Sequence, residues 1–200
     1  MARRKQDTRK LRKQIYIIGE GITEQIYFNQ LRISERLSIR IKPEIPYSTD
    51  ITGIIKKAEV YKNASPANKV FCVIYLDRIH SDKAEKKKYV NIKKNHNNSK
   101  QIFFFETNPC FEFWFLLHFE YSSREYANCK NLTGKLIKCI PDYSKTEEYL
   151  RNKNLYNILK EKLPEAVSNS KKLEENHVNT KCDIYKIIEN FNINNQNYKQ

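Results

Sequence analysis

Carboxylates follow three separate apolar runs of this sequence, at positions from which they could act together. Glu20 and Glu24 follow "QIYIIG", Asp77 ends "KVFCVIYLD", and Glu112 comes shortly after "KQIFFFET". Clustered carboxylates repel one another and raise each other's pKa unless a cation neutralises them. Hard oxygen ligands with open positions for phosphate suit Mg²⁺ or Mn²⁺. Such a metal polarises a phosphodiester and activates water, so the pattern points to phosphodiester hydrolysis.

Each of these acids also has an ordinary structural interpretation. Glu20 and Glu24 fit the start of a helix, where the helix dipole and a cap favour carboxylates. Asp77 fits a turn at a strand end, and Glu112 fits a first helical turn. The functional interpretation is favoured because the acids come from independent segments and fall on one predicted edge. Asp82, in the loop after Asp77, extends the set of candidate metal ligands.

The elements that must position these acids alternate along the chain. The sequence predicts strands over 14–19, 38–47, 69–77 and 100–107, each followed by a helix, over 23–37, 48–63, 81–94 and 108–120. Thr23 is the expected N-cap of the first helix, and Asn108 begins the last, with Pro109 in its first turn. This alternation predicts an α/β fold with an open, mostly parallel sheet and helices on both faces. Sites in such sheets form at the carboxyl ends of the strands.

The chain divides into three expected regions. With 200 residues, 40% of them hydrophobic, it fits one domain or one domain with an appendage. We expect a basic flexible arm over 1–13, an α/β domain over 14–120, and a helical region over 121–200 that packs on the same core. No strand signal is found after residue 120.

The formal net charge of +14 favours a polyanionic partner, of which nucleic acid is the commonest. The arm holds seven Arg or Lys and one Asp, and so contributes +6 of this charge. The residues expected to contact nucleic acid are Arg3 and Arg4 of the arm, Arg78, and Lys86 and Lys87 of the charged helix. The alternative is that the Lys, Asn, Ile and Tyr content reflects an A+T-rich coding bias, and that the charged helix presents a solvated face.

Cysteine usage and hydropathy narrow the setting. The five cysteines are odd in number and form no CxxC pair, which favours reduced thiols in the cytoplasm over a disulfide framework or a zinc site. "IYIIG" is too short for the core of a signal peptide, and "CFEFWFLLHF" is far short of the ~20 residues of a membrane span. No membrane association is expected. Neither GxGxxG nor a Walker sequence is present, so we do not expect ATP binding within this chain.

Four segments of the chain resemble a known family. "IIGEGITEQIYF", "VIYLDRIHSD", "NPCFEFWFLLHF" and "AVSNSKKLEENH…CDIYKIIENF" are similar to the RloB family of bacterial defence-associated proteins, which carry a Toprim-like domain. The NPCFExW segment is the most specific, whereas EGxTE is shared with Toprim nucleases of the overcoming-lysogenization-defect type. The resemblance implies a catalytic role for Glu20, a supporting role for Glu24, and metal binding by Asp77.

The sequence departs from the Toprim pattern at the expected DxD pair, because "YLDRIH" offers one aspartate. If Asp77 is the first aspartate, Ile79 replaces the second, and if it is the second, Tyr75 replaces the first. Asp82, His80 and Glu112 are the candidates for the missing ligand. His118, at the end of the NPCFExW segment, is either a packed core residue or a ligand or general acid. The aromatic residues of that segment are interpreted as core.

Two functions follow as expectations. The first is a Toprim-type, Mg²⁺- or Mn²⁺-dependent nuclease acting on DNA or RNA in anti-phage defence or abortive infection. The second is a catalytically degenerate nucleic-acid-binding or regulatory subunit. The family resemblance implies an AAA or ABC-type ATPase as its partner, and the single aspartate favours this alternative.

Overall fold

A four-stranded parallel sheet forms the centre of the protein, in the order β2-β1-β3-β4. The computed structural model describes residues 14–37, 40–46, 48, 50–176 and 179–191, and for 40–43 it describes the backbone alone. The strands are β1 (Gln14–Ile18), β2 (Arg40–Glu44), β3 (Lys69–Tyr75) and β4 (Ile102–Thr107). The predicted α/β architecture with a parallel sheet is confirmed. The arm, with Arg3 and Arg4, lies outside the described residues.

The two central strands are apolar on both sides, as expected when helices cover both faces of a parallel sheet. In β1, Ile15 and Ile17 point into one hydrophobic cluster, while Tyr16 and Ile18 point into the other. In β3, Phe71 and Val73 alternate in the same way with their neighbours. This two-sided burial explains why both strands could be recognised from continuous apolar runs.

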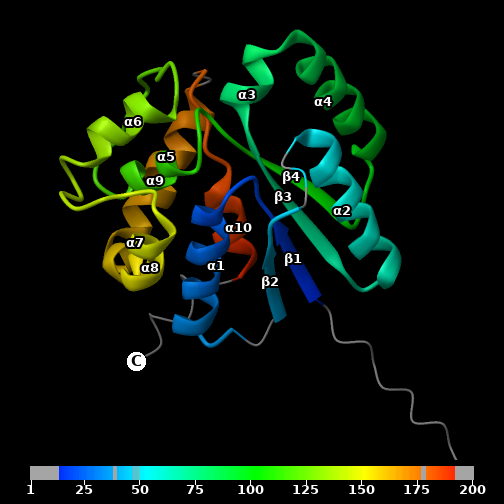
Figure 1. Ribbon diagram of the computed structural model, residues 1–200, viewed down its shortest axis with the longest axis horizontal. Coiled ribbons are helices and arrows are strands. Elements are labelled where there is room, and N and C mark those ends of the chain that lie inside the picture. The colour runs from blue at the N-terminus through cyan, green and yellow to red at the C-terminus, as the bar shows by residue number, and fades with distance from the viewer. Residues whose placement is uncertain (1–13, 38–39, 47, 49, 177–178, 192–200) are drawn as a thin grey trace, which may run out of the picture.

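Helices cover the two faces unequally (Figure 1). α2 (Ile51–Ala64), α3 (Leu76–Ser81) and α4 (Lys83–His96) lie on one side of the sheet, and α1 (Ile22–Ser34) lies on the other. The chain moves from β1 outward to β2 and then back across β1 to β3, so right-handed crossovers place α1 and α2 on opposite faces. Chain direction across the sheet therefore reverses between β1 and β3. A crevice at the carboxyl ends of such strands is the usual ligand site of an open α/β sheet.

The C-terminal helices join α1 on the larger face (Figure 1). They are α5 (Glu112–Leu117), α6 (Cys129–Leu136), α7 (Glu147–Asn152), α8 (Leu155–Leu159), α9 (Leu163–Glu175) and α10 (Ile184–Asn190), with a 3₁₀ turn at Lys160–Lys162. An aromatic core holds them together: Trp114 is fully buried, and its Nε1 donates to the hydroxyl of Tyr27 on α1 at 2.9 Å. The interpretation of the NPCFExW aromatics as core is confirmed for Phe111, Phe113 and Phe115.

The segment before α10 extends the sheet edge at β4. Thr107 and Cys182 form an isolated antiparallel bridge, and Lys181 pairs with Glu106 at 2.6 Å and with Asp183 at 3.3 Å. Burial tends to raise the pKa of Glu106, but hydrogen bonds from Lys181, Lys93 and Tyr89 outweigh burial and lower this pKa to about 2.

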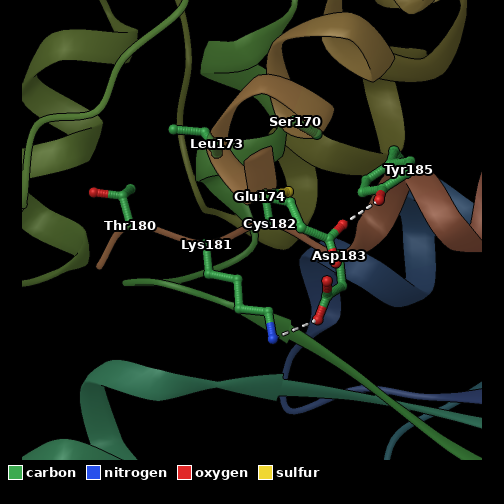
Figure 2. Close-up of a pocket in the computed structure, with 8 residues that line it drawn as sticks. All are labelled: Ser170, Leu173, Glu174, Thr180, Lys181, Cys182, Asp183 and Tyr185. Carbon is green, nitrogen blue, oxygen red and sulfur yellow. Dashed lines mark hydrogen bonds and ion pairs between the residues drawn. The ribbon is translucent and has the colours of Figure 1, made fainter. Parts of the chain in front are cut away.

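A pocket of about 250 Å³ lies between this segment and α9 (Figure 2). Each of its charged side chains has a partner: Lys181 pairs with Asp183, and Glu174 accepts from the Tyr185 hydroxyl. The bridge to β4 and these contacts hold the segment before α10 and the start of α10 against β4 and α9.

The helix expected over 108–120 begins later than predicted. Residues 108–111 form a turn with a cis Asn108–Pro109 peptide bond, and α5 starts at Glu112. Asn108 does not cap this helix, because its backbone N–H donates to Lys181 O at 2.8 Å and its side-chain amide donates to Asn179 O at 3.1 Å. Pro109 is accordingly not in the first helical turn. α3, which carries Asp77, was expected as the end of a strand and a loop.

Gly53, near the start of α2, allows a close approach that a larger residue would prevent. A Cβ at this position would lie 2.0 Å from the backbone oxygen of Ser48, whereas a Cβ at Gly134, in α6, would meet nothing within 4 Å. We expect Gly53→Ala to lower the free energy of unfolding by about 1–3 kcal/mol. Gly134→Ala is expected to raise it by about 0.5–1 kcal/mol, because alanine is the better helix former. Urea unfolding of both variants is the measurement, and equal effects of the two substitutions would contradict the geometry at α2.

Candidate functional site

Glu20 joins the ends of the two central strands. Its Oε1 accepts from the backbone N–H of Tyr75, at the end of β3, at 2.8 Å, and its Oε2 pairs with Arg78 Nη1 at 3.1 Å. The side chain is only 7% exposed, and this burial raises the pKa of Glu20 to about 7. The Tyr75 N–H and the Arg78 guanidinium oppose the shift, while the charge of Asp77 adds to it. Glu20 therefore lies at the crevice where the chain direction reverses.

Glu24 is the buried half of a capping box. Gly21 is the N-cap of α1, and Glu24 Oε1 accepts from the backbone N–H groups of Glu20 at 3.0 Å and Gly21 at 3.2 Å. The prediction of Thr23 as N-cap is wrong, because this carboxylate takes over the capping. The absence of a side chain at Gly19 makes space for this carboxylate, because a Cβ at position 19 would lie 2.8 Å from Glu24 Oε1.

The environment of Glu24 opposes its ionisation. The residue is 1% exposed, and its Oε2 has no hydrogen-bond partner among the described residues. Burial raises the pKa of Glu24 to about 7; the nearby Tyr75 hydroxyl lowers it, and the charges of Glu112 and Glu20 raise it. The mutual effect on pKa means that these three carboxylates share one neighbourhood.

Glu112 opens α5 and is fully buried. Its Oε1 accepts from the Tyr143 hydroxyl at 2.9 Å and from Thr23 Oγ1 at 3.3 Å, and it forms an ion pair with Lys145 at 2.9 Å. Thr23 thus links α1 to the first residue of α5. The segment after α6, which supplies Tyr143 and Lys145, closes the site from the C-terminal side.

Asp77 lies in the first turn of α3, two residues beyond the end of β3. Its Oδ1 accepts from the N–H of Arg78 at 2.7 Å. Burial raises the pKa of Asp77; Arg78 and Lys145 lower it, and Glu112 raises it further. Asp77 is thereby within electrostatic reach of both Glu20 and Glu112.

Asp82 borders this site but serves α4. Its Oδ1 accepts from the N–H groups of Ala84 at 2.7 Å and Glu85 at 3.1 Å, which makes it the N-cap of that helix. An open pocket of about 210 Å³ begins at Glu20 and is lined also by Asp50, Ile51, Arg78, Ile79, Ser81, Asp82 and Glu85. The pocket carries more acidic than basic side chains, and of Glu20, Glu24, Asp77 and Glu112 it is lined by Glu20 alone.

The remaining predicted site residues lie apart from these carboxylates or serve other contacts. Lys86 and Lys87 are exposed on α4, whose first turn borders the pocket. His118 is 1% exposed, its Nδ1 lies 2.8 Å from Trp114 O, and burial lowers its pKa to about 4. A neutral histidine in this environment fits the core interpretation. Asn108 holds the C-terminal segment, as described above.

Sequence reasoning missed three residues that contact the carboxylates. Tyr75 had been considered only as the replacement of an aspartate, yet its backbone binds Glu20 and its hydroxyl lies beside Glu24. Tyr143 and Lys145 come from a segment that was expected to be helical and had no motif of its own. A buried glutamate needs a partner, but nothing in the sequence indicates which of the many lysines lies beside Glu112.

The expectation that all cysteines are reduced is wrong for two of them. Cys110 and Cys129 form a disulfide in this structure, whereas Cys72, Cys139 and Cys182 are free. The two partners are 19 residues apart, and the turn after β4 and the start of α6 bring their Cα atoms within 5.7 Å. An odd number of cysteines and the lack of a CxxC pair do not exclude such a long-range contact.

The possible donor atoms of the crevice are carboxylate oxygens, the ligands that hard divalent cations prefer. One of them, Glu24 Oε2, is buried and has no hydrogen-bond partner among the described residues. As the side chains stand, Arg78 and Lys145 balance the charges of Glu20 and Glu112. In the described part of the chain, the only set of three Cys, His or acidic ligand atoms within 4.8 Å of one another is Cys110, Glu112 and Cys129. Coordination of a cation by Glu20 Oε2 would require the Arg78 guanidinium to move away.

The fold and the crevice define an α/β protein with buried carboxylates at the reversal point of a parallel sheet. A profile of the RloB family, described as RloB-like protein, matches residues 15–191. The chain therefore belongs to the RloB-like protein family. No curated protein and no solved structure gives a significant match. Among the described residues, no helix is both long and apolar enough to cross a membrane.

The raised pKa of Glu24 predicts a pH-dependent stability. Because its pKa is about 7 in the folded protein and ordinarily 4.5, the folded state binds more protons between these values. The free energy of unfolding must then fall as pH rises from about 4.5 to 7. Glu24→Gln keeps an oxygen that can accept a hydrogen bond at the cap, but its side chain does not ionise. Between these pH values the free energy of unfolding of the variant should therefore fall by up to about 3 kcal/mol less than that of the parent protein.

Urea unfolding at pH 5 and pH 8 is the measurement. The matched control is Glu175→Gln, an exposed carboxylate in the last turn of α9, which should follow the parent protein. Parallel loss of stability in the parent protein and in Glu24→Gln would contradict the burial of an ionisable Glu24.

Proposed function

We propose that this RloB-like chain is a Toprim-like, metal-dependent phosphodiester nuclease that acts in the cytoplasm in bacterial anti-phage defence. The observation that carries the proposal is the set of carboxylates at the reversal point between β1 and β3. Glu20 and Glu24 follow β1, Asp77 follows β3 and Glu112 follows β4. Their charges act on one another: Asp77 raises the pKa of Glu20, and Glu112 raises the pKa of Glu24 and of Asp77. Buried acids of this kind cost stability, so their retention in a chain of charge +14 favours a functional role.

The chain's own residues would divide the work as follows. Glu20, whose pKa lies near neutrality, would orient the attacking water or accept a proton from it. Asp77, helped by Glu24 or Asp82, would hold Mg²⁺ or Mn²⁺ beside the phosphate. The bound cation supplies Lewis-acid polarisation of the phosphodiester and neutralises its charge.

Basic residues around the crevice are suited to bind the backbone of DNA or RNA. Arg78 pairs with Glu20 but its side chain is half exposed, so a substrate phosphate can compete for the guanidinium. Lys86 and Lys87 are exposed on α4, close to the helix turn that borders the pocket. In this proposal they steer the phosphate backbone, together with Arg3 and Arg4 of the arm.

The ion pairs at the site favour a second function. Arg78 with Glu20 and Lys145 with Glu112 satisfy two carboxylates without a metal, and Asp77 has Tyr75 and Ile79 where a second aspartate is expected. A nucleic-acid-binding or regulatory subunit that partners an AAA or ABC-type ATPase would need no more than this. Calorimetry separates the two functions: the nuclease requires Mg²⁺ or Mn²⁺ binding at millimolar concentration or below, and the regulatory subunit does not.

The nuclease proposal predicts the effects of two substitutions that replace a carboxylate by an amide of nearly the same size. We expect Glu20→Gln and Asp77→Asn to reduce cleavage of DNA or RNA in Mg²⁺ or Mn²⁺ by about 100-fold or more, because each removes a charge at the reacting centre. The assay uses labelled single- and double-stranded substrates of both nucleic acids, with the thermal midpoint of each variant recorded in parallel.

Glu175→Gln is the matched control, because it makes the same carboxylate-to-amide change at an exposed residue in the last turn of α9. It should cleave as the parent protein does. Absence of cleavage by the parent protein in either metal, or equal cleavage by Glu20→Gln, would overturn the nuclease proposal.

A further inference from the structure

Two sulfurs and a carboxylate meet at the start of α5. The Sγ atoms of Cys110 and Cys129 and a carboxylate oxygen of Glu112 lie within 4.8 Å of one another. They come from the turn after β4, from α5 and from the first residue of α6. Cys110 and Glu112 are buried and Cys129 is partly buried. This cluster is distinct from Glu20 and Asp77, although it shares Glu112 with the acidic crevice.

The contact between Glu112 and Cys129 is unsatisfied when the disulfide is closed. Glu112 Oε2 lies 3.1 Å from Cys129 Sγ, and a disulfide sulfur carries no hydrogen to donate. The Lys145 ammonium lies 2.9 Å from Glu112 Oε1 and 3.3 Å from the same sulfur. The position between carboxylate and sulfur thus favours positive charge, which a thiol proton, an ammonium or a metal ion can supply.

We propose that Cys110, Glu112 and Cys129 form a Zn²⁺-class metal site that becomes available when the Cys110–Cys129 disulfide is reduced. Two thiolates and one carboxylate are a donor set that zinc accepts, with the fourth position left for water. Thiolates exclude Mg²⁺ and Ca²⁺, which prefer oxygen. Tyr143 and Thr23, which donate to Glu112 Oε1, orient the carboxylate as outer partners of the site.

A phosphine can reduce the Cys110–Cys129 disulfide in a balanced reaction. The phosphine attacks one sulfur and cleaves the S–S bond, and water then supplies the oxygen of the phosphine oxide and the two protons of the thiols. Metal binding displaces those two protons as the thiols become thiolates. Lys145 must withdraw, which its 45% exposed side chain can do toward solvent. Occupancy ties Glu112 to the sulfurs, and so couples the thiol state to the acidic crevice.

Cobalt is the probe, because Co²⁺ replaces Zn²⁺ and its visible absorption reports tetrahedral thiolate coordination. We expect the full chain, reduced with the phosphine and freed of it anaerobically, to bind one Co²⁺ with thiolate charge-transfer bands that added Zn²⁺ abolishes. The oxidised chain should show no such bands. Cys129→Ser should lose them, while the matched control Cys139→Ser, another partly buried cysteine outside the disulfide, should keep them.

A second measurement needs no variant. Alkylation of the reduced parent protein followed by mass spectrometry should show that Zn²⁺ protects Cys110 and Cys129, at least tenfold in rate, and leaves Cys139 unprotected. Both readouts are independent of nuclease activity, so they can succeed when the proposed function fails. Absence of thiolate bands in the reduced chain, equal bands in Cys129→Ser and the parent protein, or equal alkylation with and without Zn²⁺ would overturn the proposal.

Discussion

The burial of like charges at one edge of the parallel sheet is the constraint on which this structure depends. Glu20 and Glu24 follow β1 within six residues, and both have pKa values raised to about 7 by burial. The protein tolerates them by distributing hydrogen bonds: backbone N–H groups of Tyr75, Glu20 and Gly21 point at the two carboxylates. Folding thus creates a crevice whose charge state responds to protons and to any cation that enters it.

The second half of the chain supplies side chains that contact the carboxylates of that crevice. Glu112 is fully buried on the C-terminal side of β4, and it is held by Tyr143 and Lys145, which lie more than thirty residues further on. The C-terminal helices cannot be separated from the sheet, because they share one hydrophobic cluster with α1 and β1. The disulfide between Cys110 and Cys129 lies against the same carboxylate, since Cys129 Sγ is 3.1 Å from Glu112 Oε2.

The central strands and the order of the α/β elements could be predicted from the sequence, because continuous apolar runs have a simple physical explanation in a parallel sheet. The apolar runs that became β1 and β3 are continuous, as is typical of strands buried on two faces, and Glu20 and Asp77 follow the carboxyl ends of these strands. Thr23 and Asn108 misled because each is a good cap in isolation. Glu24 instead accepts from the N–H groups that precede α1, and the amide groups of Asn108 donate to the C-terminal segment. Lys145, Tyr143 and the Cys110–Cys129 pair could not be found, because their contacts depend on tertiary packing across long chain separations.

A carboxyl-detected NMR titration of the full chain, with and without Mg²⁺, tests the central claim most directly. The account predicts that Glu20 and Glu24 titrate near pH 7 in the metal-free protein, in agreement with their burial. It also predicts that Mg²⁺ moves the titration of Glu20 to lower pH, because a bound cation favours the ionised form. Titration of Glu20 at its ordinary pKa of 4.5, unmoved by Mg²⁺, would contradict the account.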